Sequence, residues 1–139
     1  MANPYDILKD SHYTCVLCRG EEVLTTELRG VKPLVRWLVD GRSFEGFSAA
    51  DKVIGKATAF LYCLLGVTDV HALVMSQLAL DVLCNHGIVA RYDALVDNII
   101  NRNGDGICPF EAAVTDVHRP LDALPVILDK MEQMGIPID

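Results

Sequence analysis

Hydrophobic residues are grouped along the chain into short blocks that polar residues, glycines and prolines separate. The block over 13–18 has the composition of a β-strand, and a tight turn leads from it into a second strand over 22–28, which predicts a β-hairpin. A short helix is expected before it over 4–10, because Asn3 can cap its start and Pro4 suits its first position. The chain therefore begins with a helix and a hairpin.

The middle of the chain predicts two helices. One is expected over 34–39 after Pro33, and a longer one over 48–65, with Ser48 as its cap and Gly66 as its end. Beyond its first turns the longer segment is apolar on nearly every side, so it is predicted to be a buried central helix.

The second half of the chain alternates between strands and helices. The expected elements are a strand over 70–75, a helix over 77–84 capped by Ser76, a strand over 88–92, a helix from Cys108-Pro109 to about Arg119-Pro120, and a helix over 121–134. The stretch 93–100 fits a strand or a helix, and a short helix is the preferred interpretation. A tight loop is expected over 101–106.

A hairpin followed by strand–helix units predicts an α/β fold with a mixed sheet and helices on both faces. The chain of 139 residues suits a single domain over 1–139, and no repeat or linker divides it. A hydrophobic fraction of 51% agrees with a sheet that is covered on both sides. Sheets of this kind hold ligands beyond the strand ends, at helix N-termini.

Charge and cysteine content limit the expected partners and compartment. The net charge is −7 and the twelve Lys and Arg residues are scattered, so no nucleic-acid partner is expected. The longest apolar stretch, 57–65, is far shorter than the ~20 residues of a membrane span, and we expect no membrane association. Five cysteines without a secretion signal indicate a reducing, cytoplasmic location. The high apolar content also suits a homodimer.

Three charged side chains lie in the first two turns of the predicted central helix: Asp51, Lys52 and Lys56. The two lysines are four residues apart and would share a helix face, where they oppose the helix dipole. A phosphate or carboxylate held by them and by free backbone N–H groups would explain this placement, and Gly55 would allow its close approach. In the alternative interpretation Ser48 and Asp51 form a capping pair, and the lysines extend into solvent.

A second polar cluster contains Asn101, Arg102, Cys108 and Glu111. A thiol at a helix N-terminus has a lowered pKa, which makes Cys108 the candidate nucleophile, unless it serves only as a small capping residue. Glu111 stands at the reciprocal capping position of the same helix. Ser76 is predicted to cap its own helix, and its hydroxyl could contact a ligand there.

The spacing of potential ligands does not predict a metal site or a cofactor. The segment 101–112 begins like a calcium-binding EF-hand loop, but its twelfth position is Ala112 and not a bidentate glutamate. Cys15 and Cys18 form a C-x-x-C in a predicted strand, where residues three apart face opposite sides, and no second pair follows.

Four motifs together resemble one family: G-V-K-P-L (30–34), A-D-K-V-I-G-K-A (50–57), Met75-Ser76 and N-R-N-G-D-G-I-C-P-F-E (101–111). The chain resembles domain-of-unknown-function family 1893, typified by a Thermotoga maritima protein, over about residues 8–127. The resemblance implies a three-layer α-β-α, cytidine-deaminase-like fold. In that fold the helices that begin near Asp51 and at Ser76 would stand where deaminases carry H-x-E or C-x-E and P-C-x-x-C.

Neither deaminase motif is present, so the resemblance does not support zinc-dependent deamination. What it implies is the location of a pocket. Its flanking positions would be Asp51, Lys52, Lys56 and Ser76, with Asn101, Arg102, Cys108 and Glu111 at its border.

These observations predict a protein that binds a nucleotide-like or phosphorylated small molecule. Lys52, Lys56 and Arg102 would neutralise the anionic groups of the ligand. In an enzyme, acid–base chemistry would fall to Asp51 or Glu111, beside the thiol described above. A non-catalytic sensor and an interaction scaffold with a vestigial pocket stay open, because a fold does not establish an activity.

Overall fold

The computed structural model describes residues 2–101 and 103–138. Its elements are α1 (Pro4–Lys9), β1 (Cys15–Arg19), β2 (Glu22–Thr26), α2 (Lys32–Val39), β3 (Ser48–Ile54), α3 (Lys56–Leu65), β4 (Asp69–Ser76), α4 (Gln77–Asn85), β5 (Val89–Val96), α5 (Pro109–Ala113) and α6 (Pro120–Gln133). One five-stranded sheet has the order β2-β1-β3-β4-β5. β1 is antiparallel to β2 and β3, whereas β3, β4 and β5 are parallel, so the sheet is mixed, as predicted.

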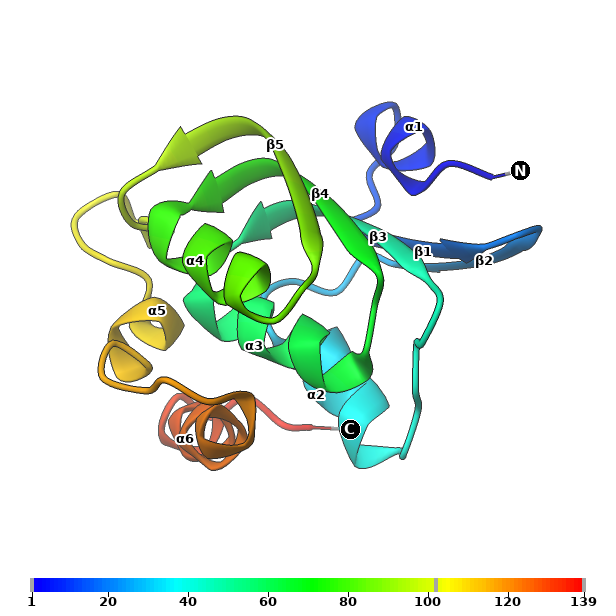
Figure 1. Ribbon diagram of the computed structural model, residues 1–139. Coiled ribbons are helices and arrows are strands. Elements are labelled where there is room, and N and C mark those ends of the chain that lie inside the picture. Colours follow the sequence, from blue (N-terminus) through cyan, green and yellow to red (C-terminus); the bar gives the residue numbers. More distant parts are fainter. Residues whose placement is uncertain (1, 102, 139) are drawn as a thin grey trace.

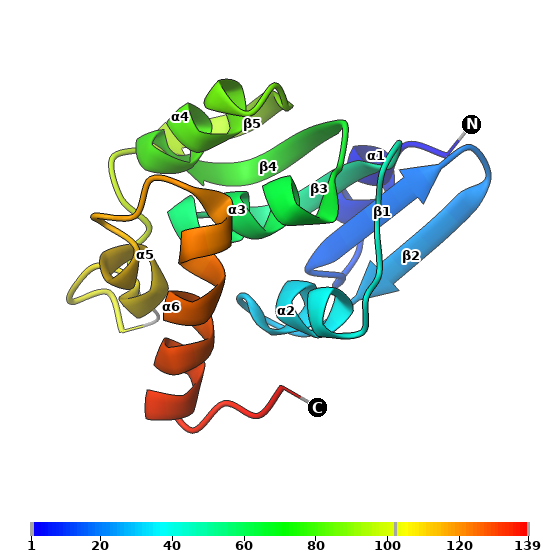
Figure 2. The same ribbon diagram turned by 60° about the horizontal axis from the view of Figure 1, so that its bottom comes forward.

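Helices cover both faces of the sheet (Figure 1). On one face α1 packs on β1 and β3, where Leu8 joins Val16 and Ala50 in a small buried cluster. Leu17 and Ala49, the neighbouring residues in the two strands, face the other way into the main core under α2, α3 and α4. Figure 2 shows α5 and α6 stacked outside α3. The architecture is therefore a three-layer α-β-α fold.

Several predicted helix boundaries are confirmed by their caps. The Asn3 side chain accepts hydrogen bonds from the first backbone N–H groups of α1. Gly66 ends α3 in the left-handed conformation, with φ 85°. The Ser76 hydroxyl accepts a hydrogen bond from the Ala79 N–H, which caps α4.

The largest correction concerns the predicted central helix over 48–65. Ser48–Ile54 forms β3, and α3 begins only at Lys56, after Gly55. β3 is the central strand and pairs with both β1 and β4, so its propensity for helix is overridden by pairing with distant strands. Asp51 and Lys52 are therefore strand residues, and Lys52 does not share a helix face with Lys56.

Two further predictions were wrong in the second half. β5 extends to Val96 because it stays paired with β4 up to Ser76, so the helical interpretation of 93–100 fails. The helix that begins at Pro109 ends at Ala113 instead of near Arg119. Among the described helices, none combines the length and the apolar character that crossing a membrane requires.

Candidate functional site

The amino ends of α3 and α4 converge on the carboxylate of Glu111, which is 1% exposed. Its Oε1 accepts hydrogen bonds from the Lys56 backbone N–H at 2.9 Å and from the Ser76 hydroxyl at 2.6 Å. Its Oε2 accepts a hydrogen bond from the Ile99 N–H. The buried negative charge is thus stabilised by three donors, two of them at the positive ends of helices.

Gly55 makes this arrangement possible by leaving room for the carboxylate. A Cβ atom at this position would lie 3.1 Å from Ile99 Cγ1 and 3.2 Å from Glu111 Oε1. The sequence predicted that a ligand would approach Gly55 closely. In the structure, the Glu111 and Ile99 side chains occupy that space instead. Glu111 was also expected to cap α5 reciprocally. Instead it reaches across to α3 and α4, and Cys108 has no side-chain capping bond.

The Lys56 side chain is nearly buried, with the residue 7% exposed. Its Nζ donates a hydrogen bond to the Thr115 carbonyl at 2.9 Å and lies 5.8 Å from the centroid of the Phe60 ring. None of the ion pairs among the described residues involves Lys56. A buried ammonium without a carboxylate partner is unfavourable, and an external anion would relieve that cost.

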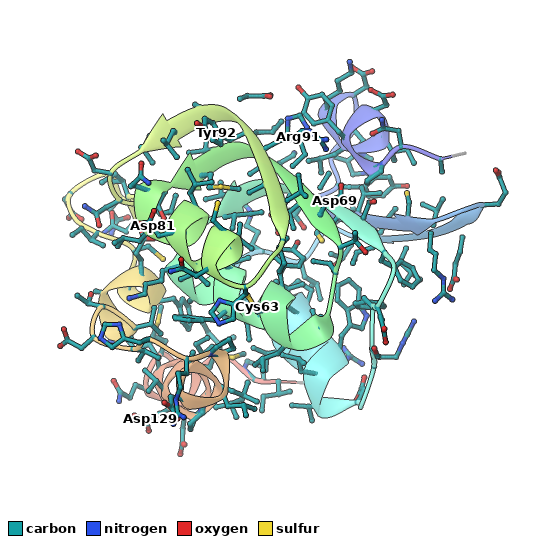
Figure 3. All side chains as sticks on the ribbon, in the orientation of Figure 1. Cys63, Asp69, Asp81, Arg91, Tyr92 and Asp129 are labelled. Carbon is teal, nitrogen blue, oxygen red and sulfur yellow. The ribbon has the colours of Figure 1, made fainter. Side chains whose placement is uncertain are left out.

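Lys56 lines a groove of about 210 Å³ between α3, α4 and the segment 114–119. The other polar residues of the groove are Asp81, Asn85, His86 and His118. Figure 3 labels Asp81 on α4. His86 Nδ1 lies 2.8 Å from the Val82 carbonyl, which can only accept, so Nδ1 is the donor. His86 Nε2 is then an acceptor in the neutral ring and a donor in the protonated one.

A larger hollow of about 550 Å³ lies between α6 and the C-terminal segment. Its lining is mostly apolar, with Pro125, Leu128, Met131 and Ile136 among the residues. It contains none of the site residues that the sequence predicts. The Lys56 groove is thus the better candidate for chemistry.

A second acid, the partly buried Asp51, lies elsewhere, between β3, β1 and α3. Its Oδ2 accepts a hydrogen bond from the Tyr62 hydroxyl at 2.7 Å, and Cys15 Sγ lies 3.1 Å from the same hydroxyl oxygen. Burial raises the pKa of Asp51 to about 7, against hydrogen bonds from Tyr62 and the Val53 N–H that lower it. Burial, together with the Asp51 charge, also raises the pKa values of Cys15 and Tyr62 well above their ordinary values.

The structure brings three predicted residues together: Lys56, Ser76 and Glu111 meet at the helix ends. Asp51 belongs to the separate cluster just described. Lys52 lies on β3, where its backbone N–H bonds the Thr14 carbonyl, and it is not among the residues that line the groove.

Two further predicted residues, Asn101 and Cys108, lie at the ends of the segment 101–108. Asn101 is engaged within it, because its side chain donates to Asp105 Oδ1 at 2.9 Å and accepts from the Asp105 N–H at 3.2 Å. Cys108 is half-buried, its N–H bonds the Ile99 carbonyl, and it does not line the groove. Arg102 lies outside the described residues.

Sequence reasoning missed much of the groove. Asp81 and Asn85 are four residues apart on α4, a helix predicted one residue short, so a search for polar pairs on one helix face would have found them. His118 had no such signal, because its place depends on how the segment before α6 packs. Among the described residues, no group of three His, Cys, Asp or Glu side chains could hold a metal ion.

The fold and site define a three-layer α/β domain in which two helix ends enclose an internal carboxylate beside a groove lined by Lys56. Residues 4–131 match a family described as a domain of unknown function (DUF1893), and the chain belongs to this family. It is similar to a DUF1893 family protein from Thermotoga maritima of known crystal structure, at 25% identity and a TM-score of 0.83. The match covers 91% of this chain and 86% of the other. No curated protein matches the sequence.

Proposed function

We propose that the protein binds a small molecule with a phosphate or carboxylate group in the Lys56 groove. The observation that carries this proposal is a nearly buried ammonium that lines an open groove and forms none of the ion pairs of the described residues. An anion placed there gains a charge-assisted hydrogen bond in a site of low dielectric.

The lining supports a ligand that is anionic at one end and rich in hydroxyl groups at the other. Lys56 Nζ has three N–H donors and uses one on the Thr115 carbonyl, which leaves donors for an anion. Asp81 and Asn85 suit hydroxyl groups, and the His118 ring adds a further polar group. A volume of about 210 Å³ lies below the usual range for ligand pockets, so it suits a sugar phosphate or the phosphate end of a nucleotide-like molecule.

A cytidine-deaminase-like arrangement is part of the proposal, and the residues at the helix starts bear on its chemistry. Deaminases of that fold use three Cys or His ligands for zinc and a glutamate for proton transfer. Here the helix ends present the Lys56 N–H and the Ser76 hydroxyl, and the Glu111 carboxylate already bonds both. These residues are not the Cys or His ligands that zinc-dependent deamination needs, and because Glu111 occupies the helix ends, the ligand is expected at the Lys56 side chain.

Binding without turnover, as in a sensor, is favoured by where the candidate nucleophile lies. Cys108 does not line the groove, and both Glu111 oxygens accept hydrogen bonds from within the chain. Neither group is therefore free to act on a ligand at Lys56.

A thermal-shift titration tests the proposal, with inorganic phosphate, ribose 5-phosphate, adenosine monophosphate and the unphosphorylated nucleoside as probes. A ligand at about 100 times its dissociation constant should add roughly 2.7 kcal/mol of stability. In Lys56→Met, which keeps the apolar stem, the response to the phosphorylated probes should be lost. In the control Lys52→Met it should persist, because Lys52 does not line the groove. No response to any anion, or an equal response in Lys56→Met, would contradict the proposal.

A further inference from the structure

The last strand of the sheet, β5, has an open outer edge. Seven of its eight residues are exposed, and only Ala90 is half-buried. Large apolar side chains are among the exposed ones, with Val89 at 53%, Tyr92 at 41% and Leu95 at 37%. An exposed apolar edge strand is a template for pairing with another strand. Figure 1 shows β5 at the margin of the sheet, beyond β4.

The two charged residues of β5 lie on the same face of the sheet as α1. The Asp93 carboxylate accepts a hydrogen bond from the Tyr5 hydroxyl at 2.8 Å and lies 3.0 Å from His71 Nε2. Arg91, two residues away, lies 3.9 Å from Asp69 on β4 and is 63% exposed (Figure 3). Since alternate residues of a strand share a face, Arg91 and Asp93 stand side by side along the open edge.

The sequence of β5 is self-complementary about Tyr92. It reads V-A-R-Y-D-A-L from Val89 to Leu95, so antiparallel pairing of two copies centred on Tyr92 sets Arg91 opposite Asp93 of the second copy. The same register sets Ala90 opposite Ala94, and Val89 opposite Leu95. Pairs of opposite charges and pairs of apolar residues stabilise an antiparallel ladder when they lie directly opposite one another. Because the pairing is symmetric about Tyr92, each of these three pairs occurs twice.

The backbone of β5 favours the same register. The Val89 N–H bonds the Thr68 carbonyl on the β4 side, so the N–H and C=O groups of Ala90, Tyr92 and Ala94 point away from β4. Pairing centred on Tyr92 brings these outward groups opposite one another, as hydrogen-bonded pairs of an antiparallel ladder require. A shift by one residue would break this match and move the side chains to the wrong face.

The opposite edge of the sheet lacks this property. In β2 (Glu22–Thr26) the corresponding self-pairing, centred on Leu24, would place Glu22 opposite Thr26 and Val23 opposite Thr25 of a second copy, with no pair of opposite charges. If the ladder continued past the strand ends, the flanking Glu21 and Glu27 would meet as like charges, so β2 is less suited than β5 to pairing with itself. Self-complementarity is therefore a feature of β5 and not of both edges.

We infer that β5 is the interface of a symmetric homodimer, in which two copies pair their β5 strands antiparallel and join their sheets into one. The interface is isologous, with the twofold axis at Tyr92. The occupant of the open edge is a second copy of this chain, because the charges of the strand complement themselves.

Light scattering during size-exclusion chromatography tests the inference at a chain concentration of about 100 μM, which suits a dimer of micromolar affinity. The wild-type protein should have twice the chain mass of 15.3 kDa. Arg91→Glu places two like pairs in the interface, and so does Asp93→Arg. Each should weaken the dimer by about tenfold or more and yield monomers.

Mixing the two single variants gives the sharpest result. In the mixed dimer the introduced glutamate meets the introduced arginine, and the native Arg91 meets the native Asp93, so a heterodimer should form. The double variant R91E/D93R should dimerise alone for the same reason. Should Asp93→Arg fail to fold without its Tyr5 and His71 bonds, Tyr92→Lys provides a separate test, because two ammonium groups would meet on the axis.

Val23→Lys on β2 is the matched control, since Val23 is 40% exposed and Tyr92 is 41% exposed. It should leave the dimer intact. A monomeric wild type overturns the inference, and so does a dimer that persists in both Arg91→Glu and Tyr92→Lys. Loss of the dimer in Val23→Lys would place the interface elsewhere than at β5. If the mixture of folded single variants stayed monomeric, the register centred on Tyr92 would be wrong.

Discussion

Two acids of the described residues, the buried Glu111 and the partly buried Asp51, have contrasting surroundings. Glu111 accepts hydrogen bonds from two backbone N–H groups and a hydroxyl, at the ends of two helices. Asp51 lies within a strand, beside the neutral Tyr62 hydroxyl and the Cys15 thiol. Its pKa rises to about 7, because burial outweighs the hydrogen bonds that lower it. The two carboxyl groups therefore differ in their surroundings: Glu111 accepts hydrogen bonds at helix ends, whereas Asp51 has a raised pKa beside a phenol and a thiol.

The two acids are also expected to affect different properties of the protein. Glu111 links the 97–113 segment to the core, since its partners lie on three different stretches of the chain. Asp51 changes charge near neutral pH and is linked to a phenol and a thiol. Glu111 is therefore expected to matter most for folding, and Asp51 for the pH dependence of stability.

The largest effect is expected from Glu111→Ala. The change leaves the Lys56 N–H, the Ser76 hydroxyl and the Ile99 N–H without their acceptor in a buried site. Loss of this network should lower the free energy of unfolding by about 4 kcal/mol, as measured by urea denaturation. The exposed Glu132→Ala is the control and should cost less than about 0.5 kcal/mol. A loss below about 1 kcal/mol for Glu111→Ala would show that the carboxylate does not hold the segment.

A smaller, pH-dependent effect is expected from Asp51→Asn. In the folded protein the pKa of Asp51 is raised from 3.8 to about 7, so the folded state holds the proton more tightly than the unfolded state. The stability that this contributes is present below pH 4 and is lost as pH rises through about 7. The variant lacks this loss, so its stability relative to wild type should increase by about 2 kcal/mol between pH 5 and pH 8.

Thermal or urea denaturation at several pH values measures this difference. Asp129→Asn, on the surface of α6, is the matched control, and its difference from wild type should stay flat over the same range. A flat difference for Asp51→Asn as well would mean that the pKa of Asp51 is not raised in the folded protein.

The sequence predicted those features whose causes are local. Caps at Asn3, Gly66 and Ser76 depend on neighbouring residues, and the helix ends were found from them. β3 was missed because its strand character depends on pairing with β1 and β4, and A-A-D-K-V-I has no local pattern that distinguishes a strand from a helix turn.

In the candidate site, too, the single residues could be predicted from the sequence, whereas their contacts could not. Lys56, Ser76 and Glu111 were selected singly, as charged or capping residues at predicted helix starts. That they contact one another could not be foreseen, since Glu111 lies 55 residues from Lys56 and 35 from Ser76. The tertiary fold makes Glu111 the anion at these helix ends. It leaves the Lys56 side chain as the feature that points to a ligand.

The smallest effect concerns the thiols that accompany the two acids, and it appears in reactivity. Cys15, beside Asp51, is 2% exposed, and burial and that charge raise its pKa well above the ordinary value. Cys108, near Glu111, is half-buried, and Cys84 on α4 is exposed. Because alkylation requires an accessible thiolate, iodoacetamide at pH 8 should modify Cys84 first, Cys108 more slowly, and Cys15 only after unfolding. Peptide mass spectrometry over time gives the three rates, and Cys84 serves as the internal standard. If Cys108 reacted faster than Cys84, its thiol would be activated, and the nucleophile predicted from the sequence would regain support over a sensor without turnover.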